Sequence, residues 1–294
     1  MKSNNSNSFA LLTLAIILMS TSGAMGRMIS LSPAVAIWIR CLLAVPILLV
    51  VVLVRRKKLI IKDRKVLKWI TLSGILLGLH WVTYFRSLHL STVSIGMLAL
   101  FTYPVFTAIL EPFILKTKFD VRSILLAVLA FAGIAIMVPS FSLEDKYTLG
   151  IVIGLISAVV YAVRNILVKK ISYGQSGVTL MLYQLVVVLL LFWPLLLSDP
   201  TFSFGKVIAN WEALLFLSVF TTAVAHTLLV ICIKQFNVTT LSTLTTTGPI
   251  FGSIFGYFLL DEVPSCRTMI GGAVILLVVV LESIRHFSRK VDAN

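Results

Sequence analysis

The sequence predicts an all-α polytopic membrane protein in which ten transmembrane helices form two inverted five-helix repeats. Of the 294 residues, 59% are hydrophobic and 12% are charged, and the mean hydropathy is +1.05. Soluble domains carry roughly 25% charged residues, so a water-soluble enzyme is excluded. The chain divides into ten apolar segments, and its two halves resemble each other at a spacing of 145 residues.

Charge clusters and Pro, Gly, Asn or Asp residues separate the apolar segments. In the first half these lie near residues 9–26, 33–54, 69–88, 94–115 and 121–138, and in the second half near 148–168, 178–197, 211–233, 238–260 and 267–284. Each is close to the length of about 20 residues that a bilayer-spanning helix needs. Helices are expected because lipid offers the backbone no hydrogen-bond partner, and the alternation typical of a barrel is absent. A cleaved signal peptide is the alternative interpretation of the first segment, but its removal would leave nine spans.

The distribution of Lys and Arg predicts the orientation of the chain. With a cytoplasmic N-terminus, 18 of the 25 Lys and Arg residues fall on the cytoplasmic side and five on the other, while Arg40 and Arg164 fall inside spans. Cytoplasmic loops carry the excess of positive charge, so both termini are predicted to be cytoplasmic. The net charge of +14 then reflects topology and contact with anionic lipid, and no nucleic-acid partner is expected.

An internal repeat explains how the segments are assembled. A shift of 145 residues places Pro104 on Pro249 and Trp81 on His226. Because five is an odd number, the second half enters the membrane from the opposite side, which makes the repeats inverted. The predicted organisation is a cytoplasmic tail (1–8), a first repeat (9–138), an external linker (139–147), a second repeat (148–284) and a cytoplasmic tail (285–294). Transporters built from such repeats bind substrate near the midplane, where the halves meet.

Short motifs occur in a fixed order along the chain. They are Arg40 in the second span, Tyr103-Pro104-Val-Phe in the fourth, Gly248-Pro249-Ile-Phe in the ninth, the acidic ending Leu259-Leu260-Asp261-Glu262, and Gly271-Gly272 in the tenth. This ordered set resembles the EamA-type branch of the drug/metabolite transporter superfamily. The first half departs from the pattern, since Lys116-Thr117 stands where the second half has Asp261-Glu262.

The resemblance implies a secondary transporter in a bacterial cytoplasmic (inner) membrane. Members of the family commonly export amino acids or other small metabolites, use no ATP site, and have a cavity lined by helices 1, 3, 4, 6, 8 and 9. The expected partners are therefore a small-molecule substrate and the lipid bilayer. Whether protons drive transport stays open at this point, with facilitated diffusion as the alternative. No cofactor is expected.

Polar and aromatic residues near the middle of the spans predict a central substrate cavity. His80 with Tyr84, and Thr222 with His226, are spaced to share one helix face. Aromatic faces would hold the apolar body of a substrate, while hydroxyls and His226 would orient its polar end. The predicted substrate-binding residues are Ser22, Trp81, Tyr84, Tyr103, Tyr161, Asn165, Thr222, His226 and Thr246.

Charged side chains inside a bilayer mostly face protein or water. For Arg40 we consider two interpretations, pairing with helix-end carbonyls and contact with substrate. For Arg164 the favoured interpretation is snorkelling toward the cytoplasmic headgroups, and a role in the cavity is the alternative. Glu111 and His226 are the candidates for proton coupling, although pairing of Glu111 with a nearby lysine is a second explanation of that acid.

Alternating access is the predicted mechanism. Pro104 and Pro249 occupy equivalent places in the repeat, and each proline frees a carbonyl and weakens one helical turn. They are therefore the candidate gating residues, with a static kink as the alternative interpretation.

Other functional classes find little support in the sequence. An intramembrane enzyme would need a nucleophile with its base or a metal-ligand set, and neither His-Glu-x-x-His nor Gly-x-Ser-x-Gly occurs. No P-loop is present, and Cys41, Cys232 and Cys266 have no metal-ligand spacing. A channel or sensor remains the alternative to a carrier, because it would fit the same number of helices.

Overall fold

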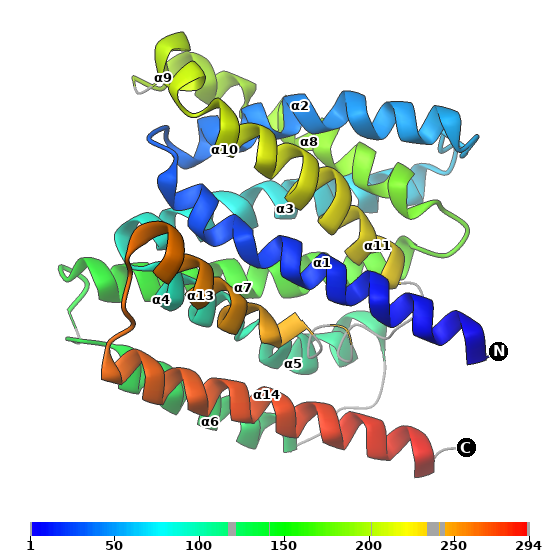
Figure 1. Cartoon of the computed structure of the whole chain (residues 1–294). Helices are drawn as coiled ribbons and strands as arrows, with labels where there is room; N and C mark the ends of the chain where they lie inside the picture. The colour runs from blue at the N-terminus through cyan, green and yellow to red at the C-terminus, as the bar shows by residue number, and fades with distance from the viewer. Residues whose placement is uncertain are drawn as a thin grey trace.

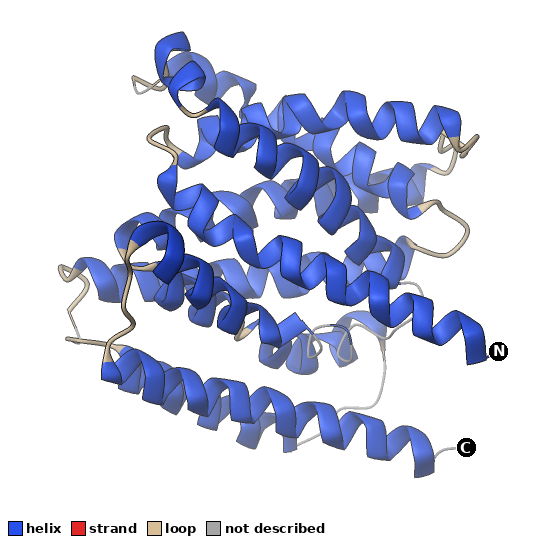
Figure 2. Cartoon of the chain, viewed as in Figure 1, coloured by secondary structure: helices blue, strands red, loops and turns tan. Residues whose placement is uncertain are grey.

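The computed structural model of the chain describes residues 2–116, 122–140, 142–200, 202–233, 241 and 245–292, except the side chains of 2–9, 122–124, 127, 246, 279 and 282–292. The described elements are helices, and these residues contain no strand (Figure 2). The first half contains α1 (Lys2–Met28), α2 (Pro33–Val54), α3 (Arg64–Leu90), α4 (Val93–Leu100), α5 (Tyr103–Leu115) and α6 (Arg122–Met137). The second half contains α7 (Lys146–Ile171), α8 (Gly177–Ser198), α9 (Phe204–Ala209), α10 (Trp211–Phe216), the π-helix η1 (Leu217–His226), α11 (Thr227–Ile233), the 3₁₀ helix η2 (Thr245–Thr247), α13 (Gly248–Leu260) and α14 (Cys266–Asp292).

Seven helical segments among the described residues are long and apolar enough to cross a membrane. They are Ala10–Met28, Pro33–Val54, Arg64–Leu90, Val93–Leu115, Lys146–Ile171, Gly177–Ser198 and Trp211–Ile233. Three shorter apolar helices, Val128–Met137, Gly248–Leu260 and Cys266–Val278, fall on the predicted fifth, ninth and tenth segments. The prediction of an all-α membrane protein is therefore confirmed, whereas ten crossings and the inverted arrangement stay predictions.

Two helices begin before their apolar segments, at positions where an aspartate side chain caps the helix. The third span begins at residue 64 and not at 69, because Asp63 Oδ1 accepts a hydrogen bond from the backbone N–H of Lys65 at 2.8 Å. In the same way α7 begins at residue 146 and not at 148, because Asp145 Oδ1 accepts from the N–H of Thr148 at 2.8 Å. Charged first turns lengthen both helices beyond their apolar cores.

The predicted fourth span is two helices, α4 and α5, separated at residues 101–102. Pro104 is the second residue of α5, and Pro249 is the second residue of α13, where a missing N–H costs no intrahelical hydrogen bond. Both helices end in a left-handed residue, Lys116 with φ 57° and Asp261 with φ 53°. The two prolines are 145 residues apart, and so are the two left-handed residues. The proline and the left-handed residue therefore occupy the same positions in α5 and α13.

The eighth span is continuous but changes its winding. Its middle third is η1, in which Thr222 Oγ1 donates to the carbonyl of Leu217 five residues earlier at 2.9 Å. Thr221 Oγ1 donates to the same carbonyl at 2.7 Å. π-helical turns are rare and are frequent at functional sites. No feature of the sequence predicts this turn, nor the short helix α9 in the loop that precedes the span.

Glycines allow the closest helix contacts. α6 and α14 lie side by side (Figure 1), and a Cβ placed on Gly271 would lie 2.4 Å from the carbonyl oxygen of Gly133. α3 packs along α7, where a Cβ on Gly150 would lie 2.9 Å from Cβ of Ser91. No larger residue fits at such distances without a shift of its neighbours, so these glycines permit the close approach of the paired helices.

Both termini lie at the same end of the helix bundle (Figure 1). The loop between α2 and α3, which carries the basic cluster 55–58, lies at that end too, and so does the loop between α7 and α8. The loops between α6 and α7 and between α13 and α14 lie at the opposite end. This arrangement matches the predicted sidedness of the loops, and assignment of the basic end to the cytoplasm stays a prediction.

Candidate functional site

A cavity of about 40 Å³ lies between the two halves of the chain. It has room for a few water molecules and is far smaller than the roughly 300 Å³ or more of typical small-molecule sites. In this structure the cavity is therefore too small to hold a metabolite. The lining residues are Met19, Ser22, Arg40, His80, Trp81, Tyr84, Phe85, Met97, Leu100, Phe101, Tyr103, Tyr161, His226 and Thr245.

Arg40 is a fully buried cation in the wall of this cavity. Its guanidinium carbon lies 4.4 Å from the centroid of the Trp81 ring, which is a cation–π geometry. Nη2 donates to Thr221 Oγ1 at 2.8 Å, and Nε donates to Thr222 Oγ1. The expected helix-end carbonyls are not its partners, and that interpretation is wrong. Within the described residues no carboxylate pairs with Arg40, and among these residues its charge is stabilised by two threonine hydroxyls and by the rings of Trp81 and Phe85.

Trp81 and His226 bond to each other across the cavity. Trp81 Nε1 donates to His226 Nε2 at 3.1 Å, and the two ring centroids are 5.0 Å apart. Because Nε2 accepts, the proton of the neutral imidazole lies on Nδ1. His226 Nδ1 is buried and has no hydrogen-bond partner among the described residues. His226 therefore places one unused N–H donor beside the cavity.

His80 has a structural role that its hydrogen bonds define. The hydroxyl of Ser157 donates to the carbonyl of His80 at 2.9 Å, and His80 Nδ1 lies 2.8 Å from the same Ser157 oxygen. A serine hydroxyl has a single hydrogen, so Nδ1–H of His80 must be the donor in the second contact. This pair joins α3 to α7 at the wall of the cavity.

Aromatic side chains form much of the remaining wall. The rings of His80 and Tyr161 stack at 4.2 Å, and Tyr161 meets Tyr103 edge to face at 4.9 Å. The hydroxyl of Tyr103 hydrogen-bonds with Oγ1 of Thr245 in η2. The rings join the first half of the chain to the second and give the cavity flat apolar surfaces with hydroxyls at their edges.

Arg164 lies inside the protein, and the snorkelling interpretation is wrong. The side chain is completely buried, with Nε and Nη2 donating to Oε1 of Gln184 at 3.0 and 2.6 Å. Nη1 donates to Oδ1 of Asn165 at 3.0 Å. A cation near a helix end can extend its side chain to the water at the membrane surface. The guanidinium of Arg164 instead donates two hydrogen bonds to Gln184 on α8.

The predicted substrate-binding residues fall into three groups. The residues that line the cavity are Ser22, Trp81, Tyr84, Tyr103, Tyr161 and His226. Thr222 and Asn165 stand one contact away, as partners of Arg40 and Arg164. The side chain of Thr246 lies outside the described part of the structure. Glu111 is half-buried in α5 and does not line the cavity. Pro104 and Pro249 stand at the starts of α5 and α13.

Sequence reasoning missed several lining residues. Thr245 belongs to the hydroxyl-rich run before Pro249, so the composition of that run was the available signal. The sequence gives no indication of the apolar lining residues, because hydropathy does not distinguish an apolar side chain that faces lipid from one that faces protein or a cavity. These residues are Met19, Phe85, Met97, Leu100 and Phe101.

An ion pair closes the end of the bundle opposite the termini. Arg27 Nε lies 2.6 Å from Glu262 Oε1, and Arg27 Nη1 donates to the carbonyls of Leu88 and Ser91. Glu262 Oε2 accepts from the first N–H of α4, that of Val93, at 2.8 Å. One carboxylate and one guanidinium thus hold the ends of α1, α3, α4 and α13 together.

The fold and cavity define a helical membrane protein with a polar site enclosed between two halves, the arrangement of a membrane transporter. Residues 7–138 and again residues 148–284 match the EamA-like transporter family. The chain belongs to the EamA-like transporter family. The family and the named relatives are transporters, which confirms the predicted resemblance and the prediction that the chain is not an enzyme.

Similar proteins carry transporter names. An uncharacterized transporter of Archaeoglobus fulgidus is 26% identical over 199 residues, which cover 68% of this chain and 70% of that protein. The pseudopaline exporter CntI of Pseudomonas aeruginosa strain UCBPP-PA14 is 24% identical over 230 residues, covering 78% of this chain and 79% of the exporter. A protein of known crystal structure shares the fold with a TM-score of 0.69 at 18% identity, covering 95% of this chain and 98% of its own.

Proposed function

We propose that the chain is a secondary transporter that exports small organic metabolites, such as amino acids, by alternating access. In this proposal ten helices cross a bacterial cytoplasmic membrane as two inverted repeats, 9–138 and 148–284, with both termini in the cytoplasm. The two family matches and the 145-residue spacing of the α5 and α13 features support the repeat. The name of the similar pseudopaline exporter supports the direction of transport.

The observation that carries the proposal is the contact between Trp81 and His226 at 3.1 Å. These residues occupy equivalent positions of the two halves, and they meet at a cavity that both halves line. A site shared by two halves changes its exposure when the halves move, which is the requirement of alternating access.

The chemistry of the wall favours a substrate with an apolar body and an acidic or other hydrogen-bond-accepting end. The rings of Trp81, Tyr103 and Tyr161 offer apolar faces. The guanidinium of Arg40 and the unused Nδ1–H of His226 are donors without a carboxylate partner in the described part of the chain. A carboxylate would complement both. Because the cavity holds about 40 Å³, it must widen to admit such a molecule.

Counterflow in proteoliposomes tests the proposal. Metabolite profiling of cells with and without the gene supplies the candidate substrates, and liposomes loaded with each candidate should then take up its labelled form saturably. Trp81→Ala should reduce this uptake at least tenfold, since the residue contacts both Arg40 and His226. The matched control is Trp193→Ala on α8, whose side chain is 50% exposed and which should transport normally. Unitary currents without counterflow, or equal uptake by both variants, would contradict the proposal.

A further inference from the structure

A second, much larger hollow lies at the end of the bundle that carries the termini. Its volume is about 990 Å³, and it opens between α2 and α8 on one side and α1, η1 and α11 on the other. We call it the basic groove. It is lined by Leu11, Val51, Arg55, Arg56, Lys57, Lys58, Gly174, Gln175, Ser176, Gly177, Val178, Ala223, Val224, Thr227, Leu228 and Ile231.

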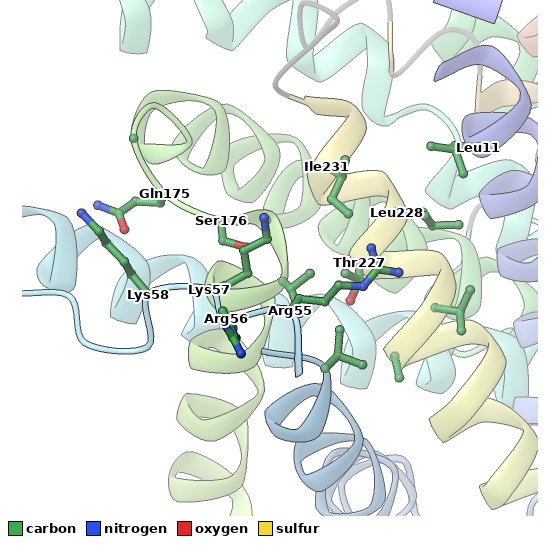
Figure 3. Close-up of a pocket in the computed structure, with 16 residues that line it drawn as sticks. Leu11, Arg55, Arg56, Lys57, Lys58, Gln175, Ser176, Thr227, Leu228 and Ile231 are labelled. Atoms are coloured by element: carbon green, nitrogen blue, oxygen red, sulfur yellow. The ribbon is translucent and has the colours of Figure 1, made fainter. Parts of the chain in front are cut away.

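Positive charge gathers at one end of the basic groove. Four consecutive cations, Arg55 to Lys58, line it, and Figure 3 shows the Arg55 side chain extending into the groove toward Thr227. The first residues of α8 also open into it, and the N-cap Ser176 makes no side-chain hydrogen bond to that helix. Uncapped backbone N–H groups and the dipole of this 22-residue helix attract anions.

An independent observation points to a ligand in the same place. Thr227 lines the groove and is 6% exposed, yet its hydroxyl has no hydrogen-bond partner among the described residues. A buried hydroxyl without a partner costs free energy, and natural structures rarely leave one unsatisfied. Thr227 Oγ1 has almost no accessible surface in this structure, so a change of χ1, for which threonine has two rotamers in a helix, would bring it to a ligand oxygen beside Arg55.

The remaining wall of the basic groove is apolar. Val224, Leu228 and Ile231 follow one side of η1 and α11 over roughly 10 Å, and Leu11 of α1 and Val51 of α2 lie across from them. Arg55 directly follows the span that ends at Val54. Its charge therefore stands at headgroup depth, while the apolar wall extends to the depth of acyl chains.

We propose that the basic groove binds one anionic phospholipid, with its phosphate held by Arg55, Arg56, the start of α8 and the hydroxyl of Thr227, and one acyl chain along α11. A phospholipid fits both parts of the groove, because its phosphate lies at the depth of the cations and its acyl chain at the depth of the apolar wall. A soluble phosphate compound would leave the apolar wall uncovered. The site is separate from the central cavity, and it does not depend on the identity of the transported substrate.

Native mass spectrometry of the purified full chain tests this site. The wild type, titrated with dioleoylphosphatidylglycerol, should retain one lipid molecule more strongly than it retains dioleoylphosphatidylcholine. R55Q/R56Q should weaken retention of the anionic lipid about 25-fold, which is roughly fivefold for each cation removed. The matched control K62Q/K65Q removes the same charge from exposed positions outside the groove and should bind like the wild type.

A second variant keeps the test independent of the arginines. Thr227→Val preserves the shape of the side chain and removes the unpaired hydroxyl, so retention of phosphatidylglycerol should fall by about fivefold. The melting temperature of the lipid-free protein should not fall, because the lost hydroxyl has no partner there. Equal losses in R55Q/R56Q and K62Q/K65Q would overturn the proposal, because any surface charge would then suffice. Displacement of the lipid by equimolar glycerol 1-phosphate would overturn it as well, since the ligand would then be a soluble phosphate. Loss of transport in R55Q/R56Q with unchanged lipid retention would instead make the groove a substrate entrance.

Discussion

At the scale of single residues, two buried arginines govern the centre of the molecule. Arg40 and Arg164 are both within spans and fully buried, and each is held by neutral groups. Neither has a carboxylate partner in the described part of the chain. A buried charge that loses its hydrogen bonds lowers the free energy of unfolding by several kcal/mol, an order-of-magnitude value. Loss of the neutral partners should therefore destabilise the fold.

The Arg164 contact gives a stability prediction. Gln184→Leu removes the single oxygen that accepts two hydrogen bonds from Arg164. We expect a loss on the order of 3 kcal/mol, as for other broken buried charge contacts, and a clearly lower melting temperature in detergent. The control is Val186→Ala on the same helix, which is 37% exposed and should change the melting temperature little. An unchanged melting temperature for Gln184→Leu would mean that Arg164 finds another acceptor.

Proton coupling gives a second prediction at this scale. If Glu111 and His226 carry the coupling proton, Glu111→Gln should abolish accumulation driven by a pH gradient while exchange of substrate at equal pH continues. His226→Gln should abolish this accumulation and also weaken exchange, because His226 lines the cavity. Accumulation by proteoliposomes with and without the gradient measures both. Coupling through these residues is wrong if both variants still accumulate substrate uphill. A wild type that merely equilibrates substrate would be a uniporter, and the central cavity would keep its proposed role.

At the scale of helices, we propose that the bundle bends where α4 is separated from α5 at residues 101–102 and where the 3₁₀ helix η2 passes into α13. Pro104 and Pro249 prevent continuous α-helical hydrogen bonding through these points. Pro104→Ala and Pro249→Ala should let the helix continue and slow transport several-fold with little loss of stability, since the replaced residues lie in first turns. Initial rates of counterflow measure the effect. Unchanged rates in both variants would assign the prolines to static kinks.

The ion pair between Arg27 and Glu262 gives a prediction about gating. Glu262→Gln keeps an oxygen for the N–H of Val93 but removes the charge that holds Arg27. Opening of that end should rise about fivefold, the amount expected from a partly exposed ion pair. The readout is the rate at which an impermeant thiol reagent labels Ser22→Cys, with Cys266 replaced by serine. Equal labelling rates with and without Glu262→Gln would show that other contacts close this end.

Hydropathy and helix caps predict most of the long helices. The features that they do not predict depend on contacts between residues far apart in the sequence. Apolar length locates each long helix, and the 145-residue shift alone pairs Trp81 with His226, the two residues that meet at the cavity. The π-helical turn of η1 and the partnership of Arg164 with Gln184 depend on neighbours distant in the sequence. Periodicity within one segment carries no information about such neighbours, which is why snorkelling is the wrong interpretation of Arg164.

At the scale of the whole molecule, sidedness is the main prediction. The termini and the basic 55–58 cluster lie at one end, and the loop before α7 lies at the other (Figure 1). In intact cells with Cys266 replaced by serine, an impermeant maleimide should label Glu144→Cys and leave Ile60→Cys unlabelled. Permeabilised cells provide the control, because both positions are exposed and both should then react. The reverse pattern in intact cells would invert the topology.

The bond between Trp81 and His226 also bears on how such a chain could have evolved. In an ancestral pair of identical five-helix subunits, a residue on the twofold axis would face its own copy. Two tryptophans could not form this contact, because an indole N–H donates and has no ring nitrogen that accepts. Under the proposed repeat, duplication of the gene released these positions to diverge, so that one became the donor and the other the acceptor. In this history the Trp–His pair is younger than the duplication that gave the two halves separate sequences.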